Sequence, residues 1–296
     1  MKGESMEYTQ KDFQEWIFLI DDKMEQFTNK FAGKNRLILD YTLASLNDLE
    51  RWILNNYSDS NELIKDSSTL DYLTIYIGET FRKYIGGKWV IDLKNKRNAY
   101  YAMPTLTDSS CRGVTYIAPM AYATACISRN KGNHISGILM NYFANQIKTI
   151  DKLVDFMEIE CYSFNSFSIG KYKAWEGLFL ERDGYNYVYG YTERGHKDIE
   201  RRFDSEEKAV RYVFEQISKG NIDNSHLVAL TLDNKEILEA ENTLKEMFIP
   251  FIRNDVPCFE QDGKTSYRIF VFGKNIRYLD DFKSRYCEHI VGNGVF

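Results

Sequence analysis

The chain has 296 residues, of which 44% are hydrophobic and 27% are charged. These are ordinary values for a folded globular protein, and the length suits two domains of about 150 residues each. The formal net charge of −5 argues against a nucleic-acid-binding protein, because such domains usually carry a clear basic excess.

The cysteines and the N-terminus indicate a reduced, cytoplasmic protein. The five cysteines are widely separated, at Cys111, Cys126, Cys161, Cys258 and Cys287, and they form no C-x-x-C pair of the kind that builds zinc sites. We therefore expect neither a metal nor a cofactor. The first residues lack the apolar core of a signal peptide, and no apolar run approaches the roughly 20 residues that cross a bilayer, so no membrane contact is expected.

The first 85 residues are predicted to be helical. Thr9 can cap a helix whose apolar residues recur with a 3.6-residue period over residues 13–27, and Gly33 is expected to break the chain. A second helix is predicted over residues 40–56 and a third over residues 68–84, where a glycine pair ends it.

The helical pattern then gives way to a small sheet. Residues 88–93 are predicted to form a strand, and residues 98–103 are a candidate for its return. Two short helices are predicted at 120–128 and 135–144. The first domain, residues 1–147, is therefore expected to be mainly helical with a small sheet.

Hairpin signals dominate the second domain, residues 148–296. Asp183-Gly184 predicts a tight turn, and Asp204 with Glu207 three residues later resembles a capping box that opens a helix over residues 204–217. The apolar stripe of this helix needs a sheet face to cover; it consists of Ala209, Val210, Val213, Phe214 and Ile217. The remaining elements are expected at 149–157, 227–232, 235–247, 258–260 with 267–272, and 278–286. The fold class is therefore α+β.

A tyrosine-rich strand is the most distinctive feature of the second domain. Tyr185, Tyr187, Tyr189 and Tyr191 alternate with other residues, so their rings are expected on one face of the strand. That face could pack under the helix 204–217, or it could form an exposed aromatic strip for a partner. In the second interpretation, a mixed-charge loop over residues 193–202 lies next to the strip and adds to the contact surface. The candidate contact residues are Tyr187, Tyr189, Tyr191, Glu193 and Arg194.

The sequence predicts no catalytic residue. Gly263-Lys264-Thr265 resembles part of a phosphate-binding loop, but the required earlier glycine is replaced by Cys258. Cys161 or Cys287 could meet His196 in space, as in thiol hydrolases. A small hydrolase with a spatially assembled Cys/His or carboxylate site, and a nucleic-acid-binding regulator, therefore stay open as alternatives.

Three segments carry a resemblance to a known class of proteins. They read D-Y-T-L-A-S-L from Asp40, Y-I-G-E-T-F-R-K-Y-I-G-G-K-W from Tyr76, and Y-V-Y-G-Y-T-E-R-G from Tyr187. The first two resemble the N-terminal region of bacterial proteins found beside polymorphic toxins, with Thr42 at a more usual serine. The third resembles modules of immunity proteins from such systems.

The resemblance implies a cytosolic protein that binds a cognate toxin domain and neutralises it by stoichiometric occlusion, without chemistry of its own. It does not identify the toxin, and nothing in the sequence indicates an oligomeric state.

Overall fold

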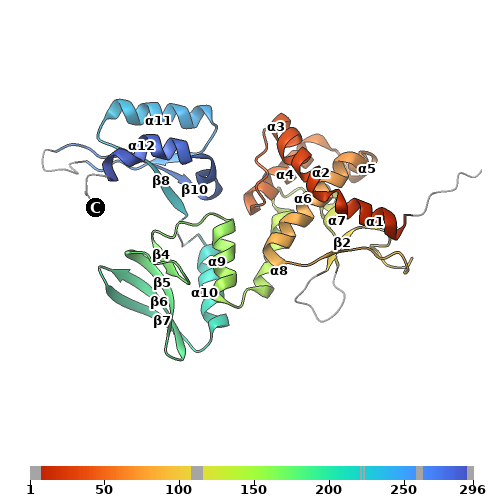
Figure 1. The fold of residues 1–296 in the computed structure, drawn as a ribbon, viewed down its shortest axis with the longest axis horizontal. Helices are drawn as coiled ribbons and strands as arrows, with labels where there is room; N and C mark the ends of the chain where they lie inside the picture. Colours follow the sequence, from red (N-terminus) through yellow and green to blue (C-terminus); the bar gives the residue numbers. More distant parts are fainter. Residues whose placement is uncertain (1–7, 108–115, 221, 223, 258–262, 292–296) are drawn as a thin grey trace, which may run out of the picture. The chain divides into compact units, whose positions relative to one another are not determined.

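The computed structural model describes residues 8–107, 116–220, 222, 224–257 and 263–291. The protein is an α+β protein that divides into two compact units, Met1–Ile147 and Lys148–Phe296 (Figure 1). Among the described residues, no helix is both long and apolar enough to cross a bilayer.

The N-terminal unit is mainly helical. Its helices are α1 (Gln10–Phe18), α2 (Ile20–Gln26), the π-helical turn η1 (Phe27–Phe31), α3 (Ala32–Asn35), α4 (Leu43–Asn56), α5 (Ser60–Lys65), α6 (Ser67–Ile85), α7 (Pro119–Arg129) and α8 (His134–Gln146). A small antiparallel sheet contains β1 (Trp89–Val90), β2 (Thr105–Thr107) and β3 (Tyr116–Ile117), in that order. Helix α6 is the centre of this unit, because it packs against α2, α5, α7 and α8.

Several predicted boundaries in this unit are wrong. Thr9 does cap α1 through a capping box with Asp12, but the helix breaks at Leu19 instead of continuing. Gly33 lies inside α3, and the helical path ends at Arg36 with a left-handed φ of 54°. A single glycine lowers helix stability only modestly, so packing overrides it.

The predicted sheet is also smaller than expected. Only Trp89–Val90 forms a strand in the segment 88–93, and its partner is Thr105–Thr107. Residues 98–103 are mostly turns and meet the first segment only in an isolated bridge between Tyr101 and Asp92. The Asp92 carboxylate accepts hydrogen bonds from the N–H groups of Lys94 and Asn95, which favours a turn over a longer ladder.

A buried carboxylate joins two helices of this unit. Glu50 of α4 is fully buried, and its oxygens accept the backbone N–H groups of His134 (3.0 Å) and Ile135 (2.9 Å) at the start of α8. The first N–H groups of a helix have no partner within the helix, and negative charge is favourable there. Glu50 therefore supplies from α4 the cap that α8 lacks in its own sequence.

The C-terminal unit begins with a sheet that is covered by a helix. After α9 (Ile150–Ile159) come β4 (Phe167–Ile169), β5 (Glu176–Asp183), β6 (Asn186–Glu193), β7 (His196–Phe203) and α10 (Glu206–Ser218). The strand order is β4-β5-β6-β7, with β4 parallel to β5 and the other pairs antiparallel. Helix α10 packs on β6 and β7, and all five residues of its predicted apolar stripe are buried.

Two expectations for this part are wrong. The mixed-charge segment 193–202 is mostly strand β7 and not a loop. All residues of β7 except Phe203 are exposed, so buried and exposed side chains do not alternate along it. The N-cap of α10 is Ser205 without a side-chain cap bond, and Asp204 instead pairs with Lys208 at 2.7 Å.

Ion pairs join β7 to β5 on the opposite face of this sheet. Phe179 and Val188 are each 1% exposed on that face. Lys197 of β7 reaches across β6 to Glu181 of β5 (2.5 Å), and its ammonium lies 5.4 Å from the centroid of the Phe179 ring. Long charged side chains can cover apolar surface with their alkyl stems, so Lys197 shields part of the Phe179 ring.

A second sheet completes the unit. This part of the unit consists of β8 (Ser225–Thr231), α11 (Asn234–Glu246), β9 (Phe251–Arg253), β10 (Tyr267–Phe272), the 3-10 turn η2 (Gly273–Tyr278) and α12 (Asp280–Val291). The three strands form the sheet. The order β8-β10-β9 places the last strand between the two that α11 connects, which is a split β-α-β arrangement. The strand predicted at 258–260 lies outside the described residues.

The α10 stripe provides a stability test. Val213→Asp is expected to lower the free energy of unfolding of the C-terminal unit by more than about 3 kcal/mol, because it buries an unpaired carboxylate at a fully buried position. Arg211→Asp on the exposed side of the same helix is expected to cost less than about 1 kcal/mol. Limited proteolysis with mass spectrometry should show new cuts only after residue 147; loss of protection in both units together would contradict two separate cores.

The capping role of Glu50 gives a second test. Glu50→Ala is expected to lower the free energy of unfolding by about 2–4 kcal/mol, because two backbone N–H groups lose their acceptor. Glu50→Gln should cost less, since its amide oxygen still accepts one of them. The matched control is Glu15→Ala on exposed α1, with an effect within about 0.5 kcal/mol in urea denaturation. Equal effects of Glu50→Ala and Glu15→Ala would show that α8 does not depend on this carboxylate.

Candidate functional site

The first two resemblance segments meet at the hydroxyl of Tyr76. This α6 side chain is fully buried, and its hydroxyl lies 2.6 Å from the Ser45 hydroxyl and accepts the backbone N–H of Tyr41 at 2.9 Å. Burial raises the pKa of Tyr76 far above its ordinary value. The hydroxyl therefore stays protonated and can act as donor and acceptor in the same network.

The short loop before α4 is organised by its own side chains. The Asp40 carboxylate accepts hydrogen bonds from the backbone N–H (3.2 Å) and hydroxyl (2.7 Å) of Thr42, and the Thr42 hydroxyl caps α4 by accepting the N–H of Ser45 at 3.1 Å. Tyr41 between them has a φ of 64°. A tyrosine in this left-handed region is strained by about 1 kcal/mol, and the bond to Tyr76 holds it there.

The glutamate and tryptophan of the second segment also meet. Glu79 accepts the indole N–H of Trp89 at 2.7 Å and pairs with Arg82 at 2.8 Å. The indole packs directly against the α6 backbone at Gly78, because a Cβ at that position would lie 2.2 Å from the Trp89 ring. Most residues of these segments are therefore explained by packing.

Two of these residues, Tyr41 and Glu79, also face a pocket of about 340 Å³, which we call the Tyr41 pocket. Its lining comes from α2, η1, the loop before α4, and α6. It consists of Asp21, Met24, Glu25, Thr28, Tyr41, Glu79 and Lys83. The Lys83 ammonium lies 4.6 Å from the centroid of the Tyr41 ring. Burial, and then the carboxylates of Glu79 and Asp21, raise the pKa of Tyr41.

The tyrosine-rich strand is divided between packing and exposure. Tyr189 is only 5% exposed and its ring meets Tyr212 of α10 edge-on at 5.2 Å, while the half-buried Tyr187 reaches Glu206 at 3.4 Å. These two residues follow the packing interpretation, and Tyr189 is too buried to touch a partner. Tyr191 is 38% exposed.

The exposed part of the strand lies at one end of the sheet. In the strand register, Glu193 of β6 lies opposite Glu176 of β5 on one side and His196 of β7 on the other. Arg194 (φ 49°) lies in the turn between β6 and β7. The Tyr191 hydroxyl donates to Glu176 at 2.9 Å. Trp175, directly before β5, is 79% exposed.

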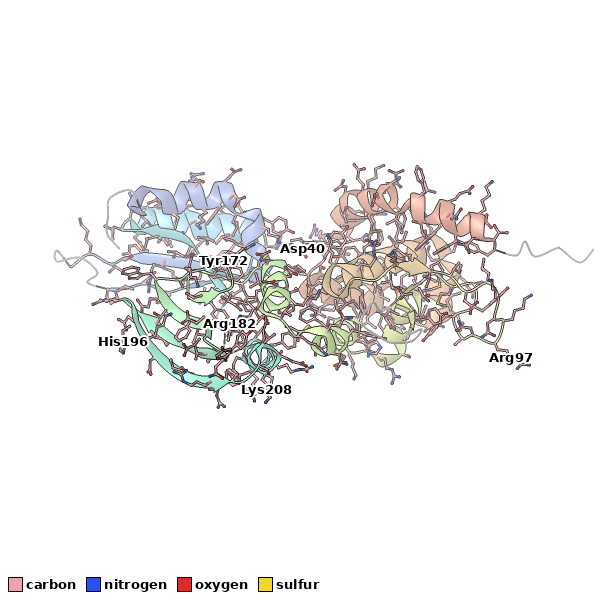
Figure 2. All side chains as sticks on the ribbon, turned by 60° about the horizontal axis from the view of Figure 1, so that its bottom comes forward. Asp40, Arg97, Tyr172, Arg182, His196 and Lys208 are labelled. Carbon is pink, nitrogen blue, oxygen red and sulfur yellow. The ribbon has the colours of Figure 1, made fainter. Side chains whose placement is uncertain are left out.

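We call these residues, Trp175, Glu176, Tyr191, Glu193 and Arg194, the hairpin-end surface. In Figure 2, His196 is labelled at this end of the sheet, whereas Arg182 lies towards the other. Sequence reasoning missed Trp175, because its place next to Glu176, the register partner of Glu193, follows from the strand pairing and not from any local pattern.

The expected approach of His196 to Cys161 or Cys287 is replaced by a contact between His226 and the backbone of Cys161. His226 of β8 lies with Nε2 2.7 Å from the backbone carbonyl oxygen of Cys161. His196 lies on exposed β7, and Cys287 is buried in α12. The Cys161 thiol lies 3.8 Å from the carbonyl oxygen of Ile159, so these contacts engage the backbone at the end of α9.

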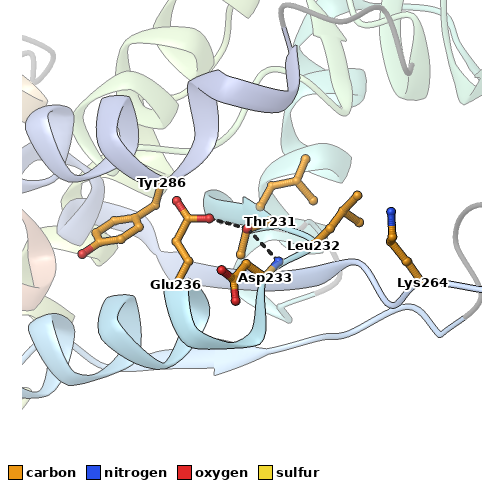
Figure 3. Close-up of a pocket in the computed structure, with 7 residues that line it drawn as sticks. Thr231, Leu232, Asp233, Glu236, Lys264 and Tyr286 are labelled. Atoms are coloured by element: carbon orange, nitrogen blue, oxygen red, sulfur yellow. Dashed lines mark hydrogen bonds between the residues drawn. The ribbon is translucent and has the colours of Figure 1, made fainter.

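A pocket of about 410 Å³ in the second sheet also contains polar groups (Figure 3). The Thr231 hydroxyl donates to Glu236 and accepts the backbone N–H of Asp233 at 3.1 Å. The Asp233 carboxylate in turn caps α11 by accepting the N–H of Lys235 at 2.7 Å. These bonds assign Thr231, Asp233 and Glu236 to the start of α11, whereas the buried hydroxyl of Tyr286 in the same lining has no hydrogen-bond partner among the described residues. Lys264, from the suspected phosphate loop, lies before a strand and not before a helix.

Comparison of the chain with protein-family models, curated proteins and solved structures found no match. Within the part of the chain that the structure describes, His, Cys, Asp and Glu side chains do not gather in groups of three that could hold a metal ion.

The packing of Trp89 against Gly78 yields a test of the N-terminal network. Gly78→Ala is expected to lower the free energy of unfolding by about 2 kcal/mol, because the new methyl group overlaps the indole and forces it to move. Gly137→Ala in α8, where a Cβ meets nothing within 4 Å, should instead raise it by about 0.5–1 kcal/mol. Thermal unfolding followed by circular dichroism measures both. A stabilising Gly78→Ala would contradict the close fit.

Proposed function

We propose that this chain is an immunity-type protein that binds a cognate toxin domain in the cytosol and neutralises it by one-to-one occlusion. The observation that carries the proposal is the hairpin-end surface, where Trp175 (79% exposed) precedes β5 at the same end of the sheet as Tyr191 (38% exposed) and the turn residue Arg194. Tryptophan, tyrosine and arginine are the residues that most often dominate the binding energy of protein interfaces.

The geometry of this surface supports tight docking. The bond from Tyr191 to Glu176 fixes the ring before any partner arrives, which reduces the entropy lost on binding. Glu193 and Arg194 provide a charged rim next to the rings, as at typical interfaces.

Docking through side chains is favoured over addition of a partner strand to β7. This edge strand carries Lys197, Arg201 and Arg202 and has a bulge opposite Tyr189/Gly190. Charges and bulges on an edge strand oppose pairing with another chain.

The same charges give little support to nucleic-acid binding. Lys197 and Arg202 pair with Glu181 and Asp183, and α10 begins with two glutamates. A phosphate backbone needs unpaired positive charge. The hydrolase alternative has one supporting observation, the approach of His226 to Cys161, but that contact is to a backbone carbonyl.

The experiment is co-expression with the proposed cognate toxin, which is sought among the products of the genes next to this one. The wild-type chain should restore growth and co-purify with the toxin at one to one. The triple variant Trp175→Ala/Tyr191→Ala/Arg194→Ala should weaken binding at least about 100-fold in calorimetry, because it removes the aromatic and arginine anchors.

Tyr185→Ala is the matched control. Tyr185 is 94% exposed but lies in the turn at the opposite end of the same hairpin, so its removal should leave the affinity unchanged. Rescue by the triple variant at full affinity would show that the surface is wrong. Rescue far below one-to-one stoichiometry, with a chemically altered toxin or product, would show that occlusion is wrong and that the chain is an enzyme.

A further inference from the structure

The Tyr41 pocket has an aromatic wall that is fixed before any ligand arrives. The Tyr41 ring stacks on Tyr76 with centroids 5.1 Å apart and planes 21° apart, and its backbone N–H donates to the Tyr76 hydroxyl. Tyr76 is itself fully buried and bonded to Ser45. A ring held in this way loses little conformational freedom on binding.

A cation already lies over this ring. The Lys83 ammonium is 4.6 Å from the ring centroid, within the roughly 6 Å over which an aromatic face attracts a positive charge. Lys83 is exposed and its stem is flexible, so such a contact is weak and the ammonium can leave. The contact demonstrates that the pocket accommodates a primary ammonium group.

The pocket has more negative than positive charge. Asp21, Glu25 and Glu79 line it against the single ammonium of Lys83. Glu79 accepts the indole N–H of Trp89 and is offset by its ion pair with Arg82, whereas Asp21 and Glu25 are exposed and form no ion pair with any other residue that the structure describes. The raised pKa of Tyr41, caused by burial and then by Glu79 and Asp21, agrees with a negative potential at the ring.

We propose that the Tyr41 pocket binds a lysine side chain of a basic protein partner, in the position over Tyr41 that Lys83 occupies in the free protein. The inference rests on the proposed function, because it assigns a second contact surface to a protein-binding chain. The net charge of −5 favours approach of a basic partner. An aromatic face with carboxylates around it suits an ammonium and rejects an anion.

The test uses the full-length protein and two small probes, Nα-acetyl-lysine methylamide and its uncharged norleucine analogue. Titration followed by two-dimensional NMR should give saturable shifts of the Tyr41, Glu79 and Lys83 amides with the lysine probe, at a Kd of about 1–10 mM, and none with the norleucine probe. Lys83→Met should tighten binding about threefold or more, since it removes the internal competitor.

The control separates the pocket from the general field of the protein. Asp21→Asn/Glu25→Gln should weaken binding of the lysine probe at least about fivefold. Glu15→Gln/Asp22→Asn makes the same charge change on α1 and α2 outside the pocket and should leave the Kd within about twofold.

Four results would overturn the inference: no saturable shift, equal binding of the norleucine probe, equal weakening by both double variants, or no gain from Lys83→Met. None of these readouts involves the toxin. Failure here with intact neutralisation would therefore remove only the pocket, whereas probe binding without neutralisation would remove only the proposed function.

Discussion

The organisation of the N-terminal unit depends on one buried phenol. A hydroxyl removed from water must find hydrogen-bond partners, or its burial costs several kcal/mol. Tyr76 of the central helix α6 finds them in Ser45 and in the backbone of Tyr41. This requirement joins α4 to α6, holds Tyr41 in its left-handed conformation, and orients the ring that forms the wall of the Tyr41 pocket. The shape of an exposed pocket is thus set by the needs of a buried group.

Both units complete helix ends with carboxylates from elsewhere in the chain. Glu50 accepts the first N–H groups of α8, and Glu206 of α10 accepts the N–H of Ile150 at the start of α9 at 2.7 Å. A helix whose own sequence lacks a side-chain cap, as α8 does, can be stabilised in this way only after another helix has packed beside it. Capping then depends on tertiary structure, which makes local stability cooperative within each unit.

The sequence predicts the features that follow from short-range patterns. The periods of α4, α6 and α10, the α10 stripe and the turn at Asp183-Gly184 need only local residues, and the structure has them. Strand β7 was missed because nearly all its side chains are exposed, so burial leaves no alternation to detect. The Tyr41 pocket was also missed. Tyr41, which forms its wall, lies in the segment that starts at Asp40. Asp21 and Lys83 come from two other helices, and no spacing along the chain relates them to Tyr41.

The tyrosines of β6 show how one strand face can serve two purposes. Alternation places Tyr187, Tyr189 and Tyr191 on the same side of β6. Helix α10 contacts the first two of them, because Glu206 accepts a hydrogen bond from Tyr187 and Tyr212 packs against Tyr189. Tyr191 lies beyond that contact, and Glu176 holds its hydroxyl. On the other face, Lys197 and Arg202 of β7 pair with Glu181 and Asp183 of β5, and Lys197 lies over the Phe179 ring. The aromatic and arginine side chains of the hairpin-end surface are therefore supported by a rigid sheet without being required for its core, which is the condition under which a surface can change its partner without losing its fold.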